Sequence, residues 1–334
     1  MNATIKDVAK QANVSIATVS RILNQSSKGY SEQTRQQVMK AVDELGYRPN
    51  ALARGLINKK TQTIGVLFPE ISGMVTSELL HGIEEMAHHL GQSVIVCNTA
   101  SQGEKTLKYL NLLDEKRVEG MVFASEVLTD EYYEALKKMH VPTVLVSTKS
   151  AKYSLPYVKV DDHDASYAAT SYLIKKGHKE IGMISGMEED PIAGSPRIRG
   201  FKAALEDHDL RSDAVIDARG FSFEHGKAAF PELIREHPLL TAVFAASDEM
   251  AVGALSSAYE WKIPVPEDLS IIGYDNSKIA EMSIPPLTTI AQPLREMGEK
   301  AVEMLSGMMK SGTNPQSIIM PHQIIERHTV RDLT

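Results

Sequence analysis

The feature that constrains this chain most is an alternation of apolar runs with amphipathic stretches from residue 63 onward. Short apolar runs are typical of buried strands, and the stretches between them carry apolar residues at helical spacing. The alternation predicts parallel sheets covered by helices on both faces, an α/β architecture. The strand-like runs are residues 63–69, 93–98, 120–125, 143–147, 180–185, 242–247 and 269–274. Because roughly 270 residues exceed one sheet of this kind, we expect two doubly wound lobes with a crossing near Asp161.

Polar side chains follow several of these runs. Ligands of such folds bind beyond the carboxyl ends of the strands, here at the cleft between the lobes. Asp248 and Asp275 follow two runs directly, and Arg197 follows the run that ends at Ser185. These groups suit a polyhydroxylated ligand because each can bridge two adjacent hydroxyls, and Phe221 can offer an apolar platform for a sugar face. Two alternatives stay open: Asp248 as a helix N-cap, and Arg197 and Asp275 as a structural salt bridge across the cleft.

Charge divides the chain at residue 60. Residues 1–60 carry ten Lys and Arg against four Asp and Glu, a net charge of +6, whereas the remaining residues carry −13. A basic head on an acidic body indicates that only the head meets a polyanion. A solvated charged face is the plainer interpretation, but the same segment also carries a motif.

The head has the pattern of three short helices. Thr4, Ser15 and Ser31 stand at N-cap positions, and Gly46 stands at a C-cap position. Each predicted helix has apolar residues on one face. These are Ile5, Val8, Ala9 and Ala12 in the first helix, Val19, Ile22 and Leu23 in the second, and Val38, Ala41, Val42 and Leu45 in the third. Three short helices with a tight first turn predict an all-α helix-turn-helix headpiece over residues 1–47.

The second helix of such a motif enters the major groove with its N-terminal residues. Arg21 is the candidate guanine reader, because its planar fork matches two acceptors on one base. Ile16 and Ala17 offer only apolar contacts, for example to a thymine methyl group. The polar candidates are Thr18 and Ser20 facing DNA, and Thr4, Ser15, Thr18 and Asn24 for phosphates. Capping is the alternative for each Ser or Thr, and one hydroxyl of Thr4 or Ser15 can do both.

Residues 48–60 join the head to the body. The stretch 48–56 is too long for a plain turn and shorter than the ~12 residues that an isolated helix needs. Pro49 fits the start of a helix, and Asn50 fits an N-cap. We expect a hinge helix that forms when two copies meet on DNA, with Leu56 as a wedge between base steps in the minor groove. Its candidate DNA contacts are Asn50, Ala53 and Leu56; an ordinary linker is the alternative.

Residues 4–9, 14–21 and 46–50 resemble the headpiece of the LacI/GalR family of bacterial transcriptional regulators. The motifs recur in the family's order and spacing, and the resemblance continues to about residue 330. It implies a homodimer on a pseudo-palindromic operator of double-stranded DNA, whose central step is opened by Leu56. The pair Ile16 and Ala17 is most similar to catabolite-control members, which implies an operator with a central CG step.

The resemblance also implies a periplasmic-binding-protein-like body. Its first lobe would comprise residues 61–161 plus 290–322, and its second lobe residues 162–289 plus 323–334. Family members bind effector through an arginine and an aspartate that match Arg197 and Asp275. Ser247 and Phe221 stand where some members have polar and aromatic contacts, so the candidate effector-binding residues are Arg197, Phe221, Ser247, Asp248 and Asp275. The loop 71–76 lacks the aromatic pair that members often carry there, which speaks against an ordinary hexose site.

Two further expectations concern partners. Catabolite-control members receive a phosphorylated carrier protein, partly through a tyrosine and an arginine, and the matching positions here hold Arg295 and Glu303. A glutamate opposite a phosphoserine would repel it, so this partner ranks second. No leucine heptad follows Thr334 in the sequence. We therefore expect a dimer without the tetramerising tail of some members.

Several classes of protein are disfavoured. The sequence has no nucleotide-binding, serine-hydrolase or zinc-protease signature, so we expect no enzyme and no cofactor. His81, His88 and His89 lack metal-ligand spacing, so we expect no metal. A polar N-terminus, the single Cys97 and the lack of an 18-residue apolar run suit a cytoplasmic protein.

The sequence therefore predicts a ligand-responsive transcription factor, a repressor of carbohydrate or carbon-metabolism genes. A sugar or sugar phosphate in the cleft would rotate the lobes and lower the affinity for the operator. Two alternatives remain open. A corepressor could tighten DNA binding, or a phosphocarrier protein could gate a regulator whose cleft is vestigial.

Overall fold

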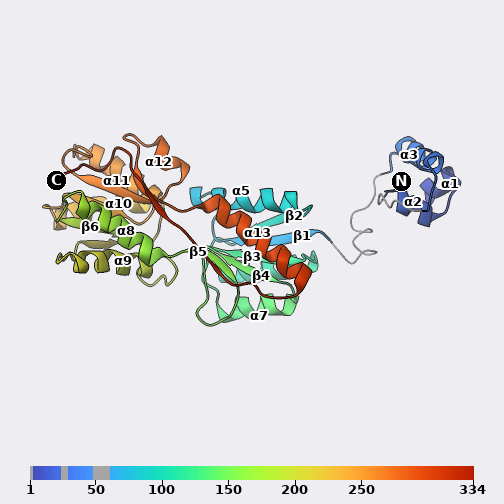
Figure 1. The fold of residues 1–334 in the computed structure, drawn as a ribbon, viewed down its shortest axis with the longest axis horizontal. Helices are drawn as coiled ribbons and strands as arrows, with labels where there is room; N and C mark the ends of the chain where they lie inside the picture. Colours follow the sequence, from blue (N-terminus) through green and yellow to red (C-terminus); the bar gives the residue numbers. More distant parts are fainter. Residues whose placement is uncertain (1–2, 24–28, 48–60) are drawn as a thin grey trace. The chain divides into compact units, whose positions relative to one another are not determined.

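The computed structural model describes residues 3–23, 29–47 and 61–334, which carry the sequence colours of Figure 1. The chain divides into two compact units, Met1–Thr61 and Gln62–Thr334. The predicted hinge helix, with Asn50, Ala53 and Leu56, lies outside the described residues, as does the phosphate contact predicted for Asn24.

Three helices form the described part of the first unit: α1 (Ile5–Gln11), α2 (Ile16–Leu23) and α3 (Glu32–Leu45). Helix α3 begins at Ser31 and ends at Gly46, whose φ of 57° lies in the left-handed region that glycine tolerates. Every predicted apolar position belongs to one cluster around Val8, Val19 and Val38, which are fully buried. Each such valine stabilises the unit by about 1.5–3 kcal/mol. The helix-turn-helix prediction is confirmed.

The second unit contains two six-stranded sheets, one in each lobe (Figure 1). The first sheet has the strand order β11-β5-β4-β3-β1-β2, and all its pairs are parallel. Its strands are β1 (Thr63–Phe68), β2 (Ser93–Asn98), β3 (Gly120–Ala124), β4 (Thr143–Val146), β5 (Tyr157–Val160) and β11 (Ile318–Met320).

The second sheet has the order β12-β10-β9-β8-β6-β7 and is parallel except where β12 pairs with β10. Its strands are β6 (Ile181–Ser185), β7 (Val215–Asp217), β8 (Ala242–Ala245), β9 (Ser270–Asp275), β10 (Thr288–Ala291) and β12 (Gln323–Ile325). The predicted architecture of two doubly wound parallel-sheet lobes is confirmed.

The described chain passes between the lobes three times, after β5, after β10 and after β11. The first and third crossings lie near Asp161 and between Met320 and Gln323, where the sequence places them. The second lies later than expected, because β10 pairs with β9 and extends to Ala291. Residues 290 and 291 therefore belong to the second lobe rather than the first.

Helices cover both faces of each sheet. The first lobe has α5 (Met74–His89), α6 (Gly103–Glu115), α7 (Asp130–Met139) and α13 (Leu294–Ser311). The second lobe has α8 (Asp162–Lys175), α9 (Gly194–Asp207), α10 (Phe223–Glu236), α11 (Asp248–Glu260) and α12 (Lys278–Met282). Among the described residues, no helix combines the length and apolar character needed to span a bilayer.

Two glycines let α5 and α13 approach closely. A Cβ atom at Gly82 would lie 1.9 Å from the carbonyl oxygen of Arg295, and one at Gly298 would lie 2.2 Å from that of Leu79. No side chain fits at these distances, so glycine is required at both positions. The contact fixes the first turns of α13, which follow the crossing after β10, against the first lobe.

Candidate DNA interface and interlobe ligand site

The first turns of α2 expose the side chains predicted to meet DNA. Ser15, Ile16, Ala17 and Arg21 are exposed, and Ile16 leaves 44% of its surface uncovered. Thr18 and Ser20 are half-buried on the same helix. Val19 and Ile22 instead point into the core, so one face of α2 builds the unit and the other is free for a partner. This division is the one that a recognition helix requires.

Ser15 and Thr4 also perform the capping roles that the sequence left open. Ser15 Oγ accepts the backbone N–H of Thr18 at 3.1 Å and lies 2.9 Å from the Thr18 hydroxyl. The hydroxyl and backbone N–H of Thr4 donate to the Asp7 carboxylate at 2.7 and 2.8 Å, and these bonds lower the pKa of Asp7. Phosphate contacts by these residues would add to their capping roles.

In the second unit, Arg197 lies in a buried cluster. Its Nε and Nη2 atoms both contact Oδ1 of Asp162 at 2.8 Å, and Nη1 donates to the carbonyl of Ala246. The guanidinium lies 3.7 Å from the ring centroid of Tyr274, whose hydroxyl donates to the same Asp162 oxygen at 3.1 Å. Burial alone would lower the pKa of Arg197, but Asp162, Tyr274 and Asp275 together outweigh burial and raise the pKa. Arg197 therefore remains a cation.

Sequence reasoning missed three members of this cluster, Lys159, Asp162 and Tyr274. Asp162 begins α8, and its second oxygen accepts a bond from Lys159 of β5. Burial favours the neutral forms of Asp162 and Lys159. The positive charges of Arg197 and Lys159 nevertheless lower the pKa of Asp162. The pKa of Lys159 is lowered by burial, against the pull of Asp162. We refer to Lys159, Asp162, Arg197 and Tyr274 as the Asp162 cluster. A lysine inside a strand and a second aspartate beside the N-cap Asp161 gave no signal of this role.

Asp275 takes a partner other than Arg197. Its Oδ1 atom accepts the side-chain N–H of Gln292 at 2.7 Å, and burial raises its pKa well above the usual range. Among the described residues, Arg197 forms its ion pair with Asp162. The structure therefore does not contain the alternative salt bridge between Arg197 and Asp275 that the sequence suggested. Asp275 also has a φ of 122°, a left-handed conformation that is strained for a residue with a side chain.

Ser247 and Asp248 begin α11 and are tied into the fold. Ser247 is the N-cap, because its Oγ accepts the N–H of Met250 at 3.1 Å, and it donates to the Phe221 carbonyl at 2.7 Å. The N-cap interpretation of Asp248 is therefore wrong. The Asp248 carboxylate is fully buried and accepts the backbone N–H of Ser277 at 2.6 Å, its hydroxyl at 3.0 Å, and the Thr289 hydroxyl. Burial raises the pKa of Asp248 to about 7.

Phe221 forms an aromatic wall near Arg197. The ring centroid lies 5.5 Å from the guanidinium carbon. The ring packs against the backbone of Gly186, where an added Cβ atom would come within 2.2 Å of it. Gly186 follows β6, so the ends of β6 and β7 together set the position of the ring. The structure thus brings Phe221 and Arg197 together.

The first lobe contributes polar groups at the carboxyl ends of β3 and β4. The Glu126 carboxylate accepts the Thr99 hydroxyl at 3.2 Å, and burial raises its pKa. Ser147 has a φ of 52°, and its buried Oγ has no hydrogen-bond partner among the described residues. These residues stand at the edge where parallel sheets bind ligands. The sequence did not single them out, because each is one polar residue after an apolar run.

Comparison with known proteins now adds to this geometry. Residues 4–50 match the model of bacterial regulatory proteins of the lacI family, and residues 170–330 match that of periplasmic binding protein-like domains. Catabolite control protein A of Priestia megaterium is 38% identical over 333 residues, covering 99% of this chain and 100% of that protein. The chain belongs to the LacI family. It is a DNA-binding transcriptional regulator, as its curated relatives are, and those relatives are not enzymes.

Solved structures of family members agree with the fold. The lac repressor dimer bound to operator and the anti-inducer ONPF has a TM-score of 0.90 at 28% identity, and the match covers 99% of this chain and 100% of that one. A complex of the regulator CelR with cellobiose has a TM-score of 0.75 at 28% identity and covers 98% and 99%.

The loop that departs from the family pattern joins the two lobes. Gly73 is the N-cap of α5 and has no side chain to bond the free backbone N–H groups. The Glu249 carboxylate of the second lobe accepts the N–H of Met74 at 3.1 Å instead. A carboxylate at a helix N-terminus is favoured by the helix dipole. The position of the missing aromatic pair is thus occupied by an interlobe contact.

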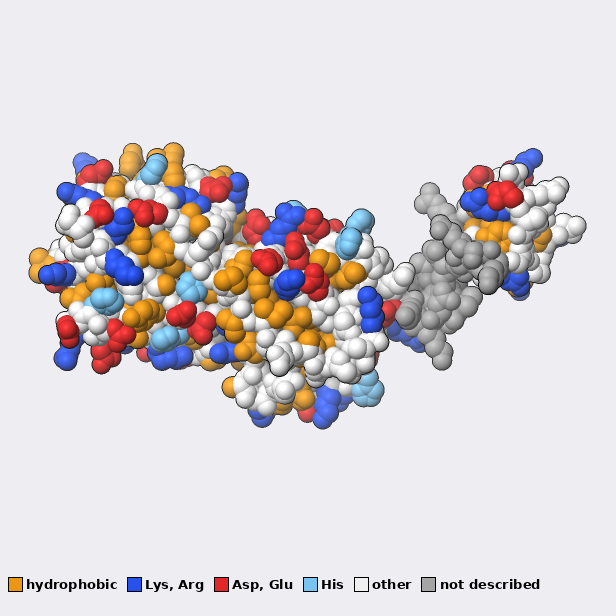
Figure 2. Space-filling view, in the orientation of Figure 1, with side chains coloured by type: hydrophobic (Ala, Val, Ile, Leu, Met, Phe, Trp, Pro, Cys, Tyr) orange, Lys and Arg blue, Asp and Glu red, His pale blue; other side chains and the backbone are white. Residues whose placement is uncertain are grey.

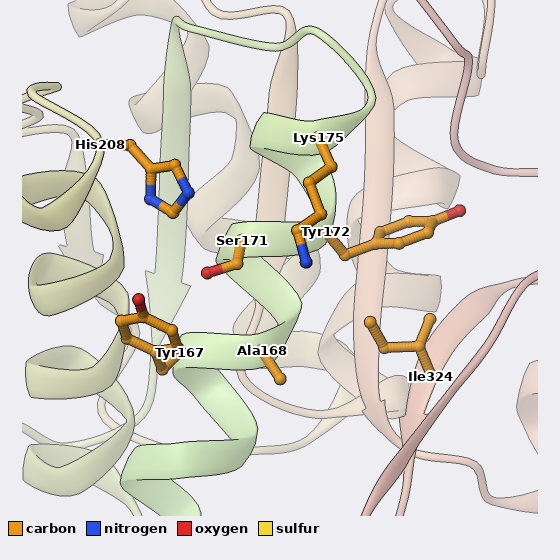
Figure 3. Close-up of a pocket in the computed structure, with 7 residues that line it drawn as sticks. All are labelled: Tyr167, Ala168, Ser171, Tyr172, Lys175, His208 and Ile324. Atoms are coloured by element: carbon orange, nitrogen blue, oxygen red, sulfur yellow. The ribbon is translucent and has the colours of Figure 1, made fainter.

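Two hollows in the second unit have no predicted effector residue in their lining. One of about 390 Å³ lies on the second lobe and is lined by Tyr167, Ala168, Ser171, Tyr172, Lys175, His208 and Ile324 (Figure 3). The other, of about 480 Å³, is lined by Glu78, Asn276, Gln292, Pro293, Leu294, Arg295, Glu296 and Glu299. It borders Asp275 through Gln292. No group of three or more potential metal ligands occurs among the described residues.

Proposed function

We propose that this regulator represses genes of carbohydrate or carbon metabolism under the control of a sugar-like effector. The effector would bind at the predicted cleft between the lobes. The observation that carries the proposal is the placement of Arg197 beside Phe221, at the carboxyl ends of the second-lobe strands. A guanidinium fork next to an aromatic ring suits a ring of hydroxyl groups. The cellobiose complex of the regulator CelR supports a sugar as the class of effector.

We assign operator recognition to the first unit. Arg21 would read a guanine, Ile16 and Ala17 would make apolar base contacts, and Ser20 would face DNA one turn along the helix. Thr4, Ser15 and Thr18 would contact phosphates. Asn24, Asn50, Ala53 and Leu56 complete the proposed set. The lac repressor dimer on its operator supports a dimer on a pseudo-palindromic site.

Control would act through the crossings between the lobes. Lys159 precedes the first crossing and Asp162 follows it, so their ion pair spans a point about which the lobes can rotate. Effector bound to one arrangement of the lobes shifts the population toward it. A useful switch needs a coupling free energy of about 1–3 kcal/mol between effector and operator.

The test is fluorescence anisotropy of the full chain on a palindromic operator with a central CG step. At fixed salt, a sugar or sugar phosphate should release the operator from the wild-type protein. Arg197→Ala and Asp275→Asn should lose this response and keep the operator affinity measured without effector. A full response in both variants would contradict the assignment of the cleft. Circular dichroism of both variants serves as the control for folding.

A second candidate is control by a corepressor or a phosphocarrier protein, as the likeness to catabolite control protein A suggests. The internal pairing of Arg197 with Asp162 favours it, since the arginine already has a counter-ion. The first-lobe surface opposes a phosphoserine partner. Arg295 pairs with Glu85 and Glu299 there, and Glu303 pairs with Lys300. Red and blue side chains lie mixed over the α5 and α13 region in Figure 2.

A further inference from the structure

The two cations of the Asp162 cluster have more donors than the fold uses. Lys159 has three N–H groups, of which Asp162 accepts one. Arg197 has five, of which Asp162 takes two and Ala246 takes one. Four N–H groups on two charged side chains thus have no acceptor within the described part of the chain. Buried donors without acceptors are unfavourable.

The same cluster has an imbalance of charge. Lys159 and Arg197 are only 6% and 7% exposed, and among the described residues Asp162 is the carboxylate that forms an ion pair with both. Asp275, the other acid nearby, bonds Gln292 instead. Two buried cations sharing one buried anion leave a surplus positive charge, which a low-dielectric interior disfavours. A hydroxyl group can satisfy a donor but cannot neutralise this charge.

An unpaired hydroxyl lies beside this cluster. The backbone N–H of Ser147 donates to the carbonyl of Val158 at 3.0 Å, which places Ser147 on the strand position next to Lys159. The Ser147 Oγ is buried and has no partner among the described residues. Lys159, Ser147 and Arg197 therefore bring unsatisfied donors to the junction of the two lobes from β5, β4 and α9.

We propose that the effector carries an anionic oxygen group, a carboxylate or a phosphate, and that Lys159 and Arg197 bind it opposite Asp162. The oxygens of such a group accept the free N–H groups and neutralise the surplus charge together. The inference rests on the proposed function, since it names the chemical class of the effector at the same site. It adds Lys159 as the residue that selects a charged ligand over its neutral counterpart.

The first test uses the full chain and two minimal probes, inorganic phosphate and acetate. Calorimetric titration at constant ionic strength, with chloride as the balancing ion, should detect binding of at least one of them. Lys159→Met should weaken that binding by roughly tenfold or more, the equivalent of one charge-assisted hydrogen bond. Phosphate without acetate would identify a phosphate site, and the reverse a carboxylate site. Binding of neither probe, or equal binding by Lys159→Met, would overturn the proposal.

Two further variants separate a local effect from a general one. Lys138→Met removes the same charge from an exposed lysine near the end of α7, and it should change the affinity less than about twofold. Asp162→Asn removes the internal anion that competes for both cations, so it should tighten phosphate or acetate binding. Weakening in Lys159→Met and tightening in Asp162→Asn are opposite in sign, so a fold that is merely damaged cannot produce both.

Operator binding distinguishes this inference from the function it rests on. Glucose, gluconate and glucose 6-phosphate share one carbon skeleton, and only the last two carry an anion. Release of the operator by either charged compound, with glucose weaker by roughly tenfold, supports both proposals. Release by glucose at the same concentration overturns the anion site and keeps sugar control. Phosphate binding that is sensitive to Lys159→Met, without operator release by any compound, keeps the anion site and overturns effector control.

Discussion

The headpiece and the interlobe site differ in the exposure and bonding of their candidate contact residues. On α2, the candidate contacts Ile16 and Arg21 are exposed, and the residues behind them form a small separate core. At the junction of the lobes, Arg197 and Asp248 are buried and already bonded within the chain. A DNA-binding surface can leave its polar side chains without protein partners, because water forms hydrogen bonds with them until DNA binds. A buried ligand site must bond most of its polar groups in the absence of ligand.

This difference indicates how much the contact side chains of each region contribute to the stability of its fold. Removing an exposed contact from α2 should affect binding and leave folding intact. Removing a buried polar group from the second unit should also lower the free energy of unfolding.

Asp248→Ala should have the largest effect. The substitution leaves the Ser277 backbone N–H and the hydroxyls of Ser277 and Thr289 without their shared acceptor in a fully buried site. At about 1–3 kcal/mol for each lost buried bond, the second unit should lose about 3 kcal/mol or more. Urea unfolding measures this, with the exposed Asp268→Ala as a control near zero. A loss below about 1 kcal/mol would mean that the site relaxes freely, and the contrast with the headpiece would fail.

The stability of the second unit should also depend on pH through Asp248. Its pKa is about 7 in the folded chain, against an ordinary value of 3.8. As the pH rises from about 4 to 7, the unfolded chain loses this proton while the folded chain keeps it, so the unfolding free energy falls. Relative to Asp248→Asn, the wild type should lose on the order of 1.4 kcal/mol for each pKa unit of the shift. Parallel unfolding curves for the two proteins across this range would contradict the raised pKa.

Arg21→Ala should act on binding alone. Arg21 is exposed on α2, so the substitution should change the stability of the headpiece by less than about 0.5 kcal/mol. Loss of a bidentate base contact should cost about 1–3 kcal/mol in operator affinity and relax the preference at one base pair. Anisotropy on a set of single-base operator variants measures both. A uniform loss on every operator would mean that Arg21 touches only phosphate.

The contrast also explains what the sequence could predict. Helical periodicity placed Val8, Val19 and Val38 in one core, because each position depends on its own neighbours along the chain. The runs that became β1, β2 and β3 were found for the same reason. The short strands β5 and β7 were not, since neither has a long apolar run.

The Asp162 cluster lay beyond sequence reasoning for a physical reason. Asp162 and Arg197 are 35 residues apart and meet only because α8 packs against α9. Lys159 joins them across a change of lobe. Ser247 and Asp248 were predicted to bind effector, yet the structure shows them bonded to Phe221, Ser277 and Thr289. Residue type and strand position indicate where a site lies, and tertiary packing decides which side chains the fold itself uses.

The smallest predicted effect gives the sharpest test of the headpiece, because the chain contains a matched pair of serines. Ser15 and Ser31 each accept a backbone N–H at 3.1 Å from a threonine three residues on, and each lies 2.9 Å from that threonine's hydroxyl. Both are exposed. Replacing either by alanine should cost the same free energy of unfolding, about 1 kcal/mol, because each loses the same helix cap.

Operator binding should distinguish Ser15→Ala from Ser31→Ala, although the two variants should have equal free energies of unfolding. Ser15 precedes the helix assigned to the major groove and is a proposed phosphate contact, whereas Ser31 caps α3. Ser15→Ala should therefore weaken operator affinity and lower its salt dependence, while Ser31→Ala should change neither once the folded fraction is equal. The measurement is anisotropy against salt at a temperature where both variants are fully folded. Equal binding by the two variants would leave Ser15 as a cap and remove it from the DNA interface. Unequal unfolding free energies would show that a shared cap geometry does not ensure a shared energy.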